Sequence, residues 1–195
     1  MDPAALPDFY RSEIAQHAAT VEATIAGCQA AFLRLVEATV EAVGAGGKII
    51  LFGNGGSAGD AQHIATELTV RYVKDRAAIA AVALTTDSSA LTAIGNDLGF
   101  EQLFARQVLA LGRKPDLAIG ISTSGNSRNV ILGLEAARKI GMAAAALAGN
   151  DGGALRGLAD PLVIVPSRVT ARIQEMHILL GHMLCGAVER RLGLA

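Results

Sequence analysis

Tryptophan is absent from this 195-residue chain, and only 4% of its residues are aromatic although 51% are hydrophobic. The core therefore has to be built from Ala, Leu, Ile and Val. Cysteine is scarce as well, because Cys28 and Cys185 are the only two, and each lies in an apolar pattern of helical spacing. This favours buried thiols in a reducing cytoplasm over a disulfide bond.

A strong charge of one sign and long apolar runs are also missing. The net charge of −1 provides no basic surface for a nucleic acid. Charged residues interrupt every apolar run well before the ~20 residues that a membrane span requires. The N-terminus has no basic segment followed by a long apolar one, so no signal peptide is expected. We expect a cytoplasmic protein in which residues 1–195 form a single domain.

What the chain does contain is a glycine-rich stretch, GNGGSAGDAQHIATE, from Gly53 to Glu67. It follows a short apolar run and leads into a helix near Ser57. Glycine permits positive φ and a close approach to a ligand, and the start of a helix leaves unpaired N–H groups that attract anions. His63 and Glu67 are four residues apart and share one face of that helix. The stretch predicts an anion site next to groups that can transfer protons or hold a metal.

Ahead of this stretch, apolar residues recur at spacings of three and four from Ile14 to Val43. This pattern is typical of a helix with a narrow apolar seam. Gly27 is a candidate break between two helices, and Gly44 is expected to end the second. We expect these N-terminal helices (1–45) to pack on another helix or another subunit. The alternative is that they simply cover the sheet.

Short apolar runs alternate with helical patterns along the rest of the chain, which predicts an α/β fold with a parallel sheet covered on both faces. The alanine-rich run at 142–148 favours helix by propensity, but its length and its place in the alternation favour a strand. The charged segment 70–78 is expected to be a surface loop. Strands are predicted at 48–52, 79–84, 116–121, 142–148 and 162–165, and helices at about 57–69, 88–94, 100–111, 127–139, 152–158 and 169–192.

A second turn, STSGNS at 122–127, follows the third predicted strand. Hydroxyl groups and the N–H groups of a helix start are suitable donors to a phosphate monoester. No Walker lysine follows either turn, and the glycine spacing differs from GxGxxG, so a nucleotide ligand is disfavoured. The alternative is that the Ser, Asn and Gly residues of these turns only cap helices and form turns, without binding a ligand. Two such turns at the carboxyl edge of one sheet favour a ligand.

The last predicted helix carries Gln174, Glu175, His177 and His182 within an apolar pattern, so these polar groups need partners or a cavity. Gln174 and His182 are eight residues apart, about 12 Å along a helix. They could reach one ion only by leaning together or by coming from different subunits. His63 and Glu67 could instead form only an ordinary i,i+4 hydrogen bond on the surface, without any role in proton transfer or metal binding. Residue spacing alone therefore supports a metal site less strongly than it supports a sugar-phosphate site.

Four motifs, GNGGSAGDAQH, ALTTDSSALTAIGND, STSGNS and ARIQEMH, resemble in order and spacing the phosphoheptose isomerases, single-domain members of the sugar isomerase (SIS) family. The resemblance covers essentially the whole chain. It implies a three-layer αβα sandwich with a five-stranded parallel sheet, preceded by N-terminal helices. It also implies a homotetramer with active sites between subunits. The implied reaction converts sedoheptulose 7-phosphate into D-glycero-D-manno-heptose 7-phosphate through an enediolate, the first step of nucleotide-activated heptose synthesis for lipopolysaccharide.

The resemblance also implies roles for individual residues. Glu67 and His182 would be the catalytic acid/base pair, and one Zn²⁺ per subunit would be bound by His63, Glu67, Gln174 and His182. Ala171 stands where some members have Asp, so no carboxylate there can be essential. The residues expected to contact substrate are Asn54, Gly55, Gly56, Ser57, Glu67, Asn96, Asp97, Ser122, Thr123, Ser124, Ser127 and Gln174.

Two functions from other classes remain open at this point. Some SIS relatives are non-catalytic adaptors that bind the replication initiator DnaA, and others are sugar-phosphate sensors. The adaptors tend to lack the groups that Glu67 and His182 supply here. An isomerase needs paired acid/base groups, so the enzyme is favoured.

Overall fold

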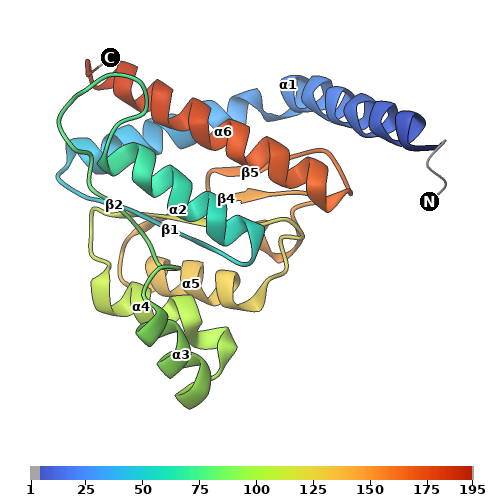
Figure 1. The fold of residues 1–195 in the computed structure, drawn as a ribbon. Helices are drawn as coiled ribbons and strands as arrows, with labels where there is room; N and C mark the ends of the chain where they lie inside the picture. The colour runs from blue at the N-terminus through green and yellow to red at the C-terminus, as the bar shows by residue number, and fades with distance from the viewer. Residues whose placement is uncertain (1–4, 195) are drawn as a thin grey trace.

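A computed structural model describes residues 5–194 (Figure 1). Its centre is a parallel sheet of five strands in the order β2-β1-β3-β4-β5. This confirms the predicted sheet, although the outer strands β2 and β5 are shorter than expected. The strands are β1 (Ile49–Gly53), β2 (Ala81–Ala83), β3 (Leu117–Ser122), β4 (Ala143–Ala148) and β5 (Leu162–Ile164).

Helices cover both faces of the sheet, which confirms the three-layer α/β architecture (Figure 1). Helices α1, α2 and α6 lie over one face and share a core with its side chains. Helices α3, α4 and α5 build the second core on the other face. The helices are α1 (Leu6–Gly44), α2 (Gly56–Thr69), α3 (Ser88–Asp97), α4 (Leu103–Leu111), α5 (Arg128–Lys139) and α6 (Thr170–Arg191), with 3-10 turns η2 (Phe100–Gln102) and η3 (Gly153–Leu155).

Helix α1 is a single continuous helix of 39 residues, so the expected break at Gly27 is wrong. A glycine inside a helix costs only about 1 kcal/mol relative to alanine. Packing of α1 against α6 and β5 on either side of Gly27 outweighs that cost. The N-terminal half of α1 projects beyond the sheet (Figure 1).

The predicted apolar seam of α1 is only partly correct. Cys28, at its centre, is buried, as are Thr20 and Thr24, but Ile25 is 64% exposed and Ile14 is also exposed. The two threonine hydroxyls donate to carbonyls one turn earlier, which satisfies them within the helix. A groove of about 260 Å³ lies between α1 and α6, with mostly apolar lining residues that include Val21, Ile25, Phe32, Leu179 and Met183.

The alanine-rich strand is confirmed. Strand β4 pairs with β3 along its full length and with β5 at its end. Its small side chains are almost all buried. Pairing on both sides therefore overrides the helical propensity of alanine at this position.

Three local predictions need correction. Helix α3 continues to Asp97, so the helix predicted at 88–94 is one turn longer than expected. The expected helix at 152–158 is reduced to the turn η3. The segment 70–78 is a loop as predicted, but the side chain of Arg76 within it is only 2% exposed. The cause is a buried carboxylate partner, which hydrophobic patterning does not reveal.

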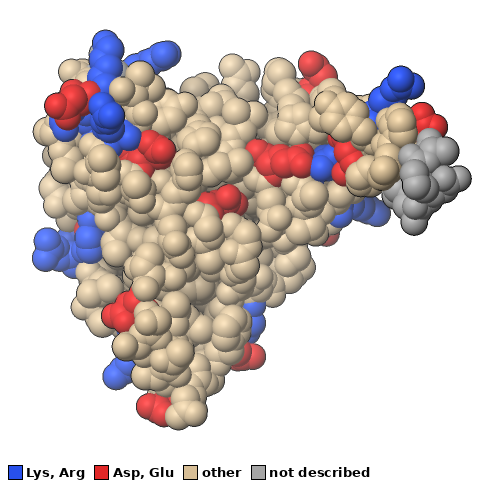
Figure 2. Space-filling view, in the orientation of Figure 1, with Lys and Arg blue, Asp and Glu red and all other residues tan. Residues whose placement is uncertain are grey.

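Both cysteines are free and buried, as predicted. No helix within residues 5–194 combines the length and apolar character needed to cross a membrane. In Figure 2, charged side chains lie mainly toward the ends of the face that α2 and α6 present, and few lie over its middle. This view therefore shows no continuous basic surface.

Candidate active site

The turn between β1 and α2 requires glycine at several positions. Gly55 adopts φ +55° and is the N-cap of α2. A Cβ atom at Gly53 would lie 2.8 Å from the carbonyl oxygen of Ile121, on the neighbouring strand. A Cβ at Gly56 would lie 2.5 Å from the amide nitrogen of Gln174. The turn thus places the start of α2 against both β3 and α6.

The two predicted ligand turns lie side by side at the carboxyl edge of the sheet. Strands β1 and β3 are paired up to Gly53 and Ile121. Beyond them, the side chains of Asn54 and Asn129 exchange two hydrogen bonds of 2.8 Å. Asn129 is buried on α5, and the sequence analysis missed it because a pair of distant amides has no characteristic spacing. This amide pair fixes the first turn to the start of α5.

The STSGNS turn is held together by its own hydroxyl groups. Ser122 donates to the Ser127 hydroxyl over 3.0 Å, and the Ser124 hydroxyl accepts from the N–H of Asn126. The first N–H groups of α5 follow directly and have no intrahelical acceptor. A hollow beside the turn is lined by Ser124, Asn126, Asn150, Asp151 and Arg168. Hydroxyl groups, helix N–H groups and a nearby cation suit an anionic group.

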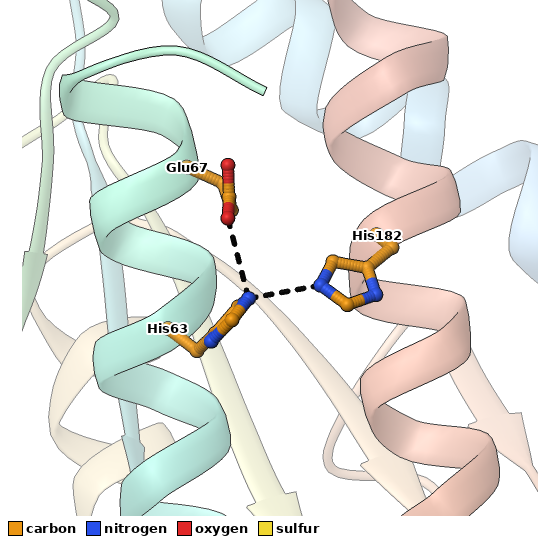
Figure 3. Close-up of side chains that lie close together, drawn as sticks. All are labelled: His63, Glu67 and His182. Atoms are coloured by element: carbon orange, nitrogen blue, oxygen red, sulfur yellow. Dashed lines mark hydrogen bonds and ion pairs between the residues drawn. The ribbon is translucent and has the colours of Figure 1, made fainter. Parts of the chain in front are cut away.

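His63, Glu67 and His182 come together between α2 and α6 (Figure 3). The His63 Nε2 atom lies 2.9 Å from Nε2 of His182 and 3.2 Å from Oε1 of Glu67. The side chain of Glu67 is 22% exposed, whereas that of His63 is 49% exposed. The cluster is therefore open to a ligand from one side while its carboxylate is largely shielded.

Two features bring α2 and α6 close enough to form this cluster. Gly181 precedes His182, and a Cβ there would lie 2.6 Å from the side chain of Ile64. The missing side chain allows the helices to approach beside both histidines. The second feature is the ring of Tyr72, which stacks on the His182 ring with ring centroids 5.8 Å apart. Tyr72 was not predicted as part of the site, because the charged pattern of 70–78 indicated only a loop.

Asp60 is a further ionisable group near the cluster. It lies three residues before His63 on α2, and its Oδ2 atom is buried without a hydrogen-bond partner within residues 5–194. Burial raises the pKa of the Asp60 carboxyl to about 6, while the charge of His63 acts in the opposite direction. Asp60 could not be predicted as part of the site, because a single aspartate in a polar helix turn has no characteristic spacing.

The donor set of the cluster fits a divalent zinc ion. Two imidazole nitrogens and one carboxylate oxygen lie within 4.8 Å of one another. These are ordinary zinc ligands, and three protein ligands with an open position are typical of catalytic rather than structural zinc sites. The same three groups, without a metal, can accept and donate protons.

One predicted metal ligand and two predicted substrate contacts need separate mention, because they lie apart from the cluster. The Gln174 amide lies next to Gly56, seven residues or about 10 Å before His63 along α2. Asn96 and Asp97 are exposed at the end of α3, on the other side of the sheet, where the Asn96 amide donates to Asp97. Within one chain, the cluster therefore consists of three of the four predicted metal ligands.

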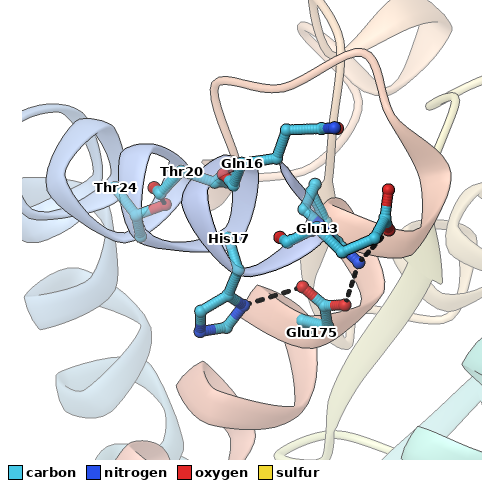
Figure 4. Close-up of polar contacts among 7 residues, drawn as sticks. Glu13, Gln16, His17, Thr20, Thr24 and Glu175 are labelled. Atoms are coloured by element: carbon cyan, nitrogen blue, oxygen red, sulfur yellow. Dashed lines mark hydrogen bonds and ion pairs between the residues drawn. The ribbon is translucent and has the colours of Figure 1, made fainter. Parts of the chain in front are cut away.

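The N-terminal end of α6, which carries Gln174, is attached to α1 by charged groups. Glu175 accepts a 2.6 Å hydrogen bond from Arg172 and lies 2.7 Å from Nδ1 of His17 (Figure 4). Arg172 also donates to the carbonyl oxygen of Glu13 over 2.6 Å. We call these four residues the α1–α6 cluster. It fixes the rotation of α6 next to the residue that contacts the glycine turn.

Comparison with known proteins gives matches over almost the whole chain. The SIS domain family matches residues 10–149. The phosphoheptose isomerase of Paramagnetospirillum magneticum is 59% identical over 181 residues, covering 93% of this chain and 94% of that protein. The structure of phosphoheptose isomerase from Neisseria gonorrhoeae has a TM-score of 0.88 at 44% identity, covering 95% of this chain and 99% of the other. The corresponding structure from Francisella tularensis has a TM-score of 0.90 at 35% identity, covering 94% and 97%.

Proposed function

The chain belongs to the SIS domain family, and from this premise we propose that it is a phosphoheptose isomerase. It converts sedoheptulose 7-phosphate into D-glycero-D-manno-heptose 7-phosphate, the first step of nucleotide-activated heptose synthesis. The observation that carries the proposal is the cluster of His63, Glu67 and His182, in which two residues come from the helix that begins at the glycine turn. A non-catalytic adaptor for DnaA would have no need of such a cluster.

The reaction moves hydrogen between two neighbouring carbons of the sugar. A base removes a proton from C1, an enediolate forms, and a proton is delivered to C2 while the hydroxyl proton passes from O1 to O2. Glu67 acts as the base, because its carboxylate is the group of the cluster best shielded from solvent beside the exposed His63. His182 exchanges the second proton as general acid and base. His63 lies between them, with its Nε2 atom 2.9 Å from Nε2 of His182 and 3.2 Å from Oε1 of Glu67, and can hydrogen-bond either one.

The two turns bind the rest of the substrate. Ser122, Thr123, Ser124 and Ser127, with the N–H groups at the start of α5, hold the phosphate. Asn54, Gly55, Gly56, Ser57 and Gln174 contact the sugar beside the start of α2. Asn96 and Asp97 contact substrate in a site shared between subunits, since within one chain they lie on the other side of the sheet. These assignments follow the motifs that resemble the family.

One Zn²⁺ per subunit belongs to the proposal, with His63, Glu67 and His182 as ligands. Gln174 would be the fourth ligand if it comes from a neighbouring subunit, since within one chain it lies apart from the cluster. When bound, the ion supplies a Lewis acid that withdraws charge from the sugar oxygens. The chain acts as a single SIS domain within a homotetramer located in the cytoplasm, and α1 packs between subunits. The exposed apolar residues of α1 and the groove beside α6 support that use of α1.

The decisive experiment is turnover of sedoheptulose 7-phosphate, followed by NMR detection of the aldose. We expect Glu67→Gln and His182→Gln each to lower kcat by about 10²- to 10⁴-fold, the usual contribution of a general acid or base. The matched control is Glu135→Gln, an exposed glutamate on α5, which should retain wild-type turnover. Absence of aldose with the wild-type protein, or full activity of Glu67→Gln, would contradict the proposed mechanism.

Zinc binding has its own measurement. Titration calorimetry of chelator-treated protein with Zn²⁺ should give about one site per chain in the wild type. His63→Gln should bind the ion more weakly, because one of the three clustered donors is lost. Equal affinity of both proteins would remove His63 from the ligand set and leave the isomerase assignment to the turnover experiment.

A further inference from the structure

Arg76 is the unusual residue of the loop that leaves α2. Its side chain is 2% exposed and pairs with Glu189 of α6, whose side chain is 1% exposed. The Nε atom of Arg76 lies 2.8 Å from Oε1 of Glu189. Charged side chains are rarely buried to this degree unless they are paired. None of the site assignments above includes this buried ion pair.

Arg76 binds the backbone of Glu67 itself. Its Nη2 atom donates to the Glu67 carbonyl oxygen over 2.8 Å, and Nη1 donates to the Leu68 carbonyl oxygen over 2.7 Å. These carbonyls belong to the last turn of α2, where intrahelical donors run out and the helix dipole favours a cation. The guanidinium group therefore fixes the residue that carries the proposed base.

Glu189 reaches the other proposed catalytic group. Its Oε1 atom accepts a 3.1 Å hydrogen bond from the backbone N–H of Tyr72. The ring of Tyr72 stacks on the imidazole of His182. Glu189 also lies seven residues, or two helical turns, after His182 on α6. One carboxylate thus connects Arg76, the loop and the surroundings of His182.

From these contacts we propose that the Arg76–Glu189 ion pair is a positioning device for the isomerisation, setting Glu67 through its backbone and His182 through Tyr72. The inference rests on the proposed function, because it assumes that Glu67 and His182 transfer the protons. Arg76 and Glu189 are positioning residues and do not touch the substrate.

The chemistry of the pair favours positioning over stability alone. Well-packed apolar side chains often replace a buried ion pair without loss of stability. An apolar pair, however, could not bond the carbonyl oxygens of Glu67, Leu68 and Ala77 and the N–H of Tyr72 in fixed directions. The planar guanidinium provides five N–H donors in a rigid fork, and a displacement of about 1 Å in a catalytic group can lower the rate about 100-fold.

The first test is Arg76→Lys, which retains the charge and the partner Glu189 but replaces the fork with one ammonium group. We expect kcat to fall by about 10- to 100-fold with KM nearly unchanged, measured well below the melting temperature. The matched control is Arg191→Lys, since Arg191 of α6 pairs with Glu37 of α1 at an exposed site and, within residues 5–194, has no hydrogen bond or ion pair with Glu67 or His182. This control should retain wild-type kcat and KM.

A second variant, Tyr72→Leu, leaves Arg76, Glu189 and the Tyr72 backbone N–H in place but removes the stacked ring. The readout is the NMR signal of the His182 imidazole, assigned by its loss in His182→Gln. The ring of Tyr72 shifts this signal in the wild type, so Tyr72→Leu should move it. Arg76→Lys should move it in the same direction if the ion pair places Tyr72.

The outcomes distinguish a failure of the positioning role from a failure of the isomerase function. Wild-type turnover together with unchanged kcat and an unchanged His182 signal in Arg76→Lys would overturn the positioning role and leave the isomerase intact. A wild-type protein without turnover would overturn the function, while the His182 signal would still report whether the pair places the ring. If Arg76→Lys does not fold, an unchanged kcat in Tyr72→Leu would overturn the route through Tyr72 to His182.

Discussion

Helix α6 is attached at its two ends by ion pairs of different character. At the C-terminal end, Arg76 and Glu189 are almost completely buried. At the N-terminal end, Arg172 is buried, but Glu175 is 36% exposed and His17 is 42% exposed. Burial weakens solvent screening but adds a large desolvation cost, so the two attachments should respond differently to the same kind of mutation.

The two ends of α6 also lie next to residues with different proposed roles. The buried pair lies next to His182 and Glu67, which need fixed positions relative to each other. The half-exposed α1–α6 cluster lies next to Gln174, which contacts the glycine turn. Proton transfer requires tighter geometry than contact with a flexible sugar. We therefore expect the more rigid attachment where the protons move.

The largest effect should come from leaving one buried charge without its partner. Glu189→Leu leaves Arg76 unpaired in the interior, and we expect the free energy of unfolding to fall by about 3–5 kcal/mol. The double variant Arg76→Met/Glu189→Leu should recover most of this loss. Urea unfolding measures both. A loss below about 1 kcal/mol for Glu189→Leu would mean that the pair behaves like an exposed one.

His177 lies between the two attachments and should make α6 sensitive to acid. Burial lowers its pKa from 6.5 to about 4, although its hydrogen bond to the Ala148 carbonyl oxygen opposes the shift. Between these pH values the unfolded chain binds the proton and the folded chain does not. The contribution of neutral His177 to the free energy of unfolding is therefore fully present above about pH 6.5. It falls by about 3 kcal/mol as the pH is lowered to about 4.

The measurement is urea unfolding of wild type and His177→Gln over this pH range. Glutamine can donate to Ala148 but cannot take up the proton. The variant should therefore lose less stability on acidification than the wild type. Parallel losses in the two proteins would place the acid sensitivity in other groups, such as the carboxylates.

The smallest effect is expected at the N-terminal attachment. Glu175→Gln retains an oxygen that can accept from Arg172, and Arg172 keeps Glu13 as a second partner. The free energy of unfolding should fall by about 1 kcal/mol or less, as is usual for exposed pairs. If urea unfolding gave a loss as large as that of Glu189→Leu, the contrast between the two ends of α6 would disappear.

Much of the architecture could be predicted because periodic patterns determine it. The alternation of apolar runs and helices gave the parallel sheet, and strand β4 followed from that alternation even though alanine favours helix. The pair His63 and Glu67 was visible from its i,i+4 spacing. That His182 joins this pair was a hypothesis, and in the structure the three side chains lie within one cluster.

The other features of the site and fold depend on contacts between residues far apart in sequence, which produce no periodic pattern. Arg76 lies in a charged segment, so its burial depends entirely on Glu189, more than a hundred residues away. The amide pair of Asn54 and Asn129 joins residues that are 75 positions apart in sequence. Gly27 was misleading for a different reason, because the packing of a long helix outweighs the small penalty of one glycine.

The amide pair between the two ligand turns has a consequence for experiments under extreme conditions. Asn54 and Asn129 each use one donor and one acceptor, and neither side chain carries a charge. Salt should therefore screen little at the amide pair, and the pair has no group that acid could protonate in the accessible pH range. If turnover declines in concentrated salt, the cause should lie in the capture of the phosphorylated sugar rather than in any loosening between the turns.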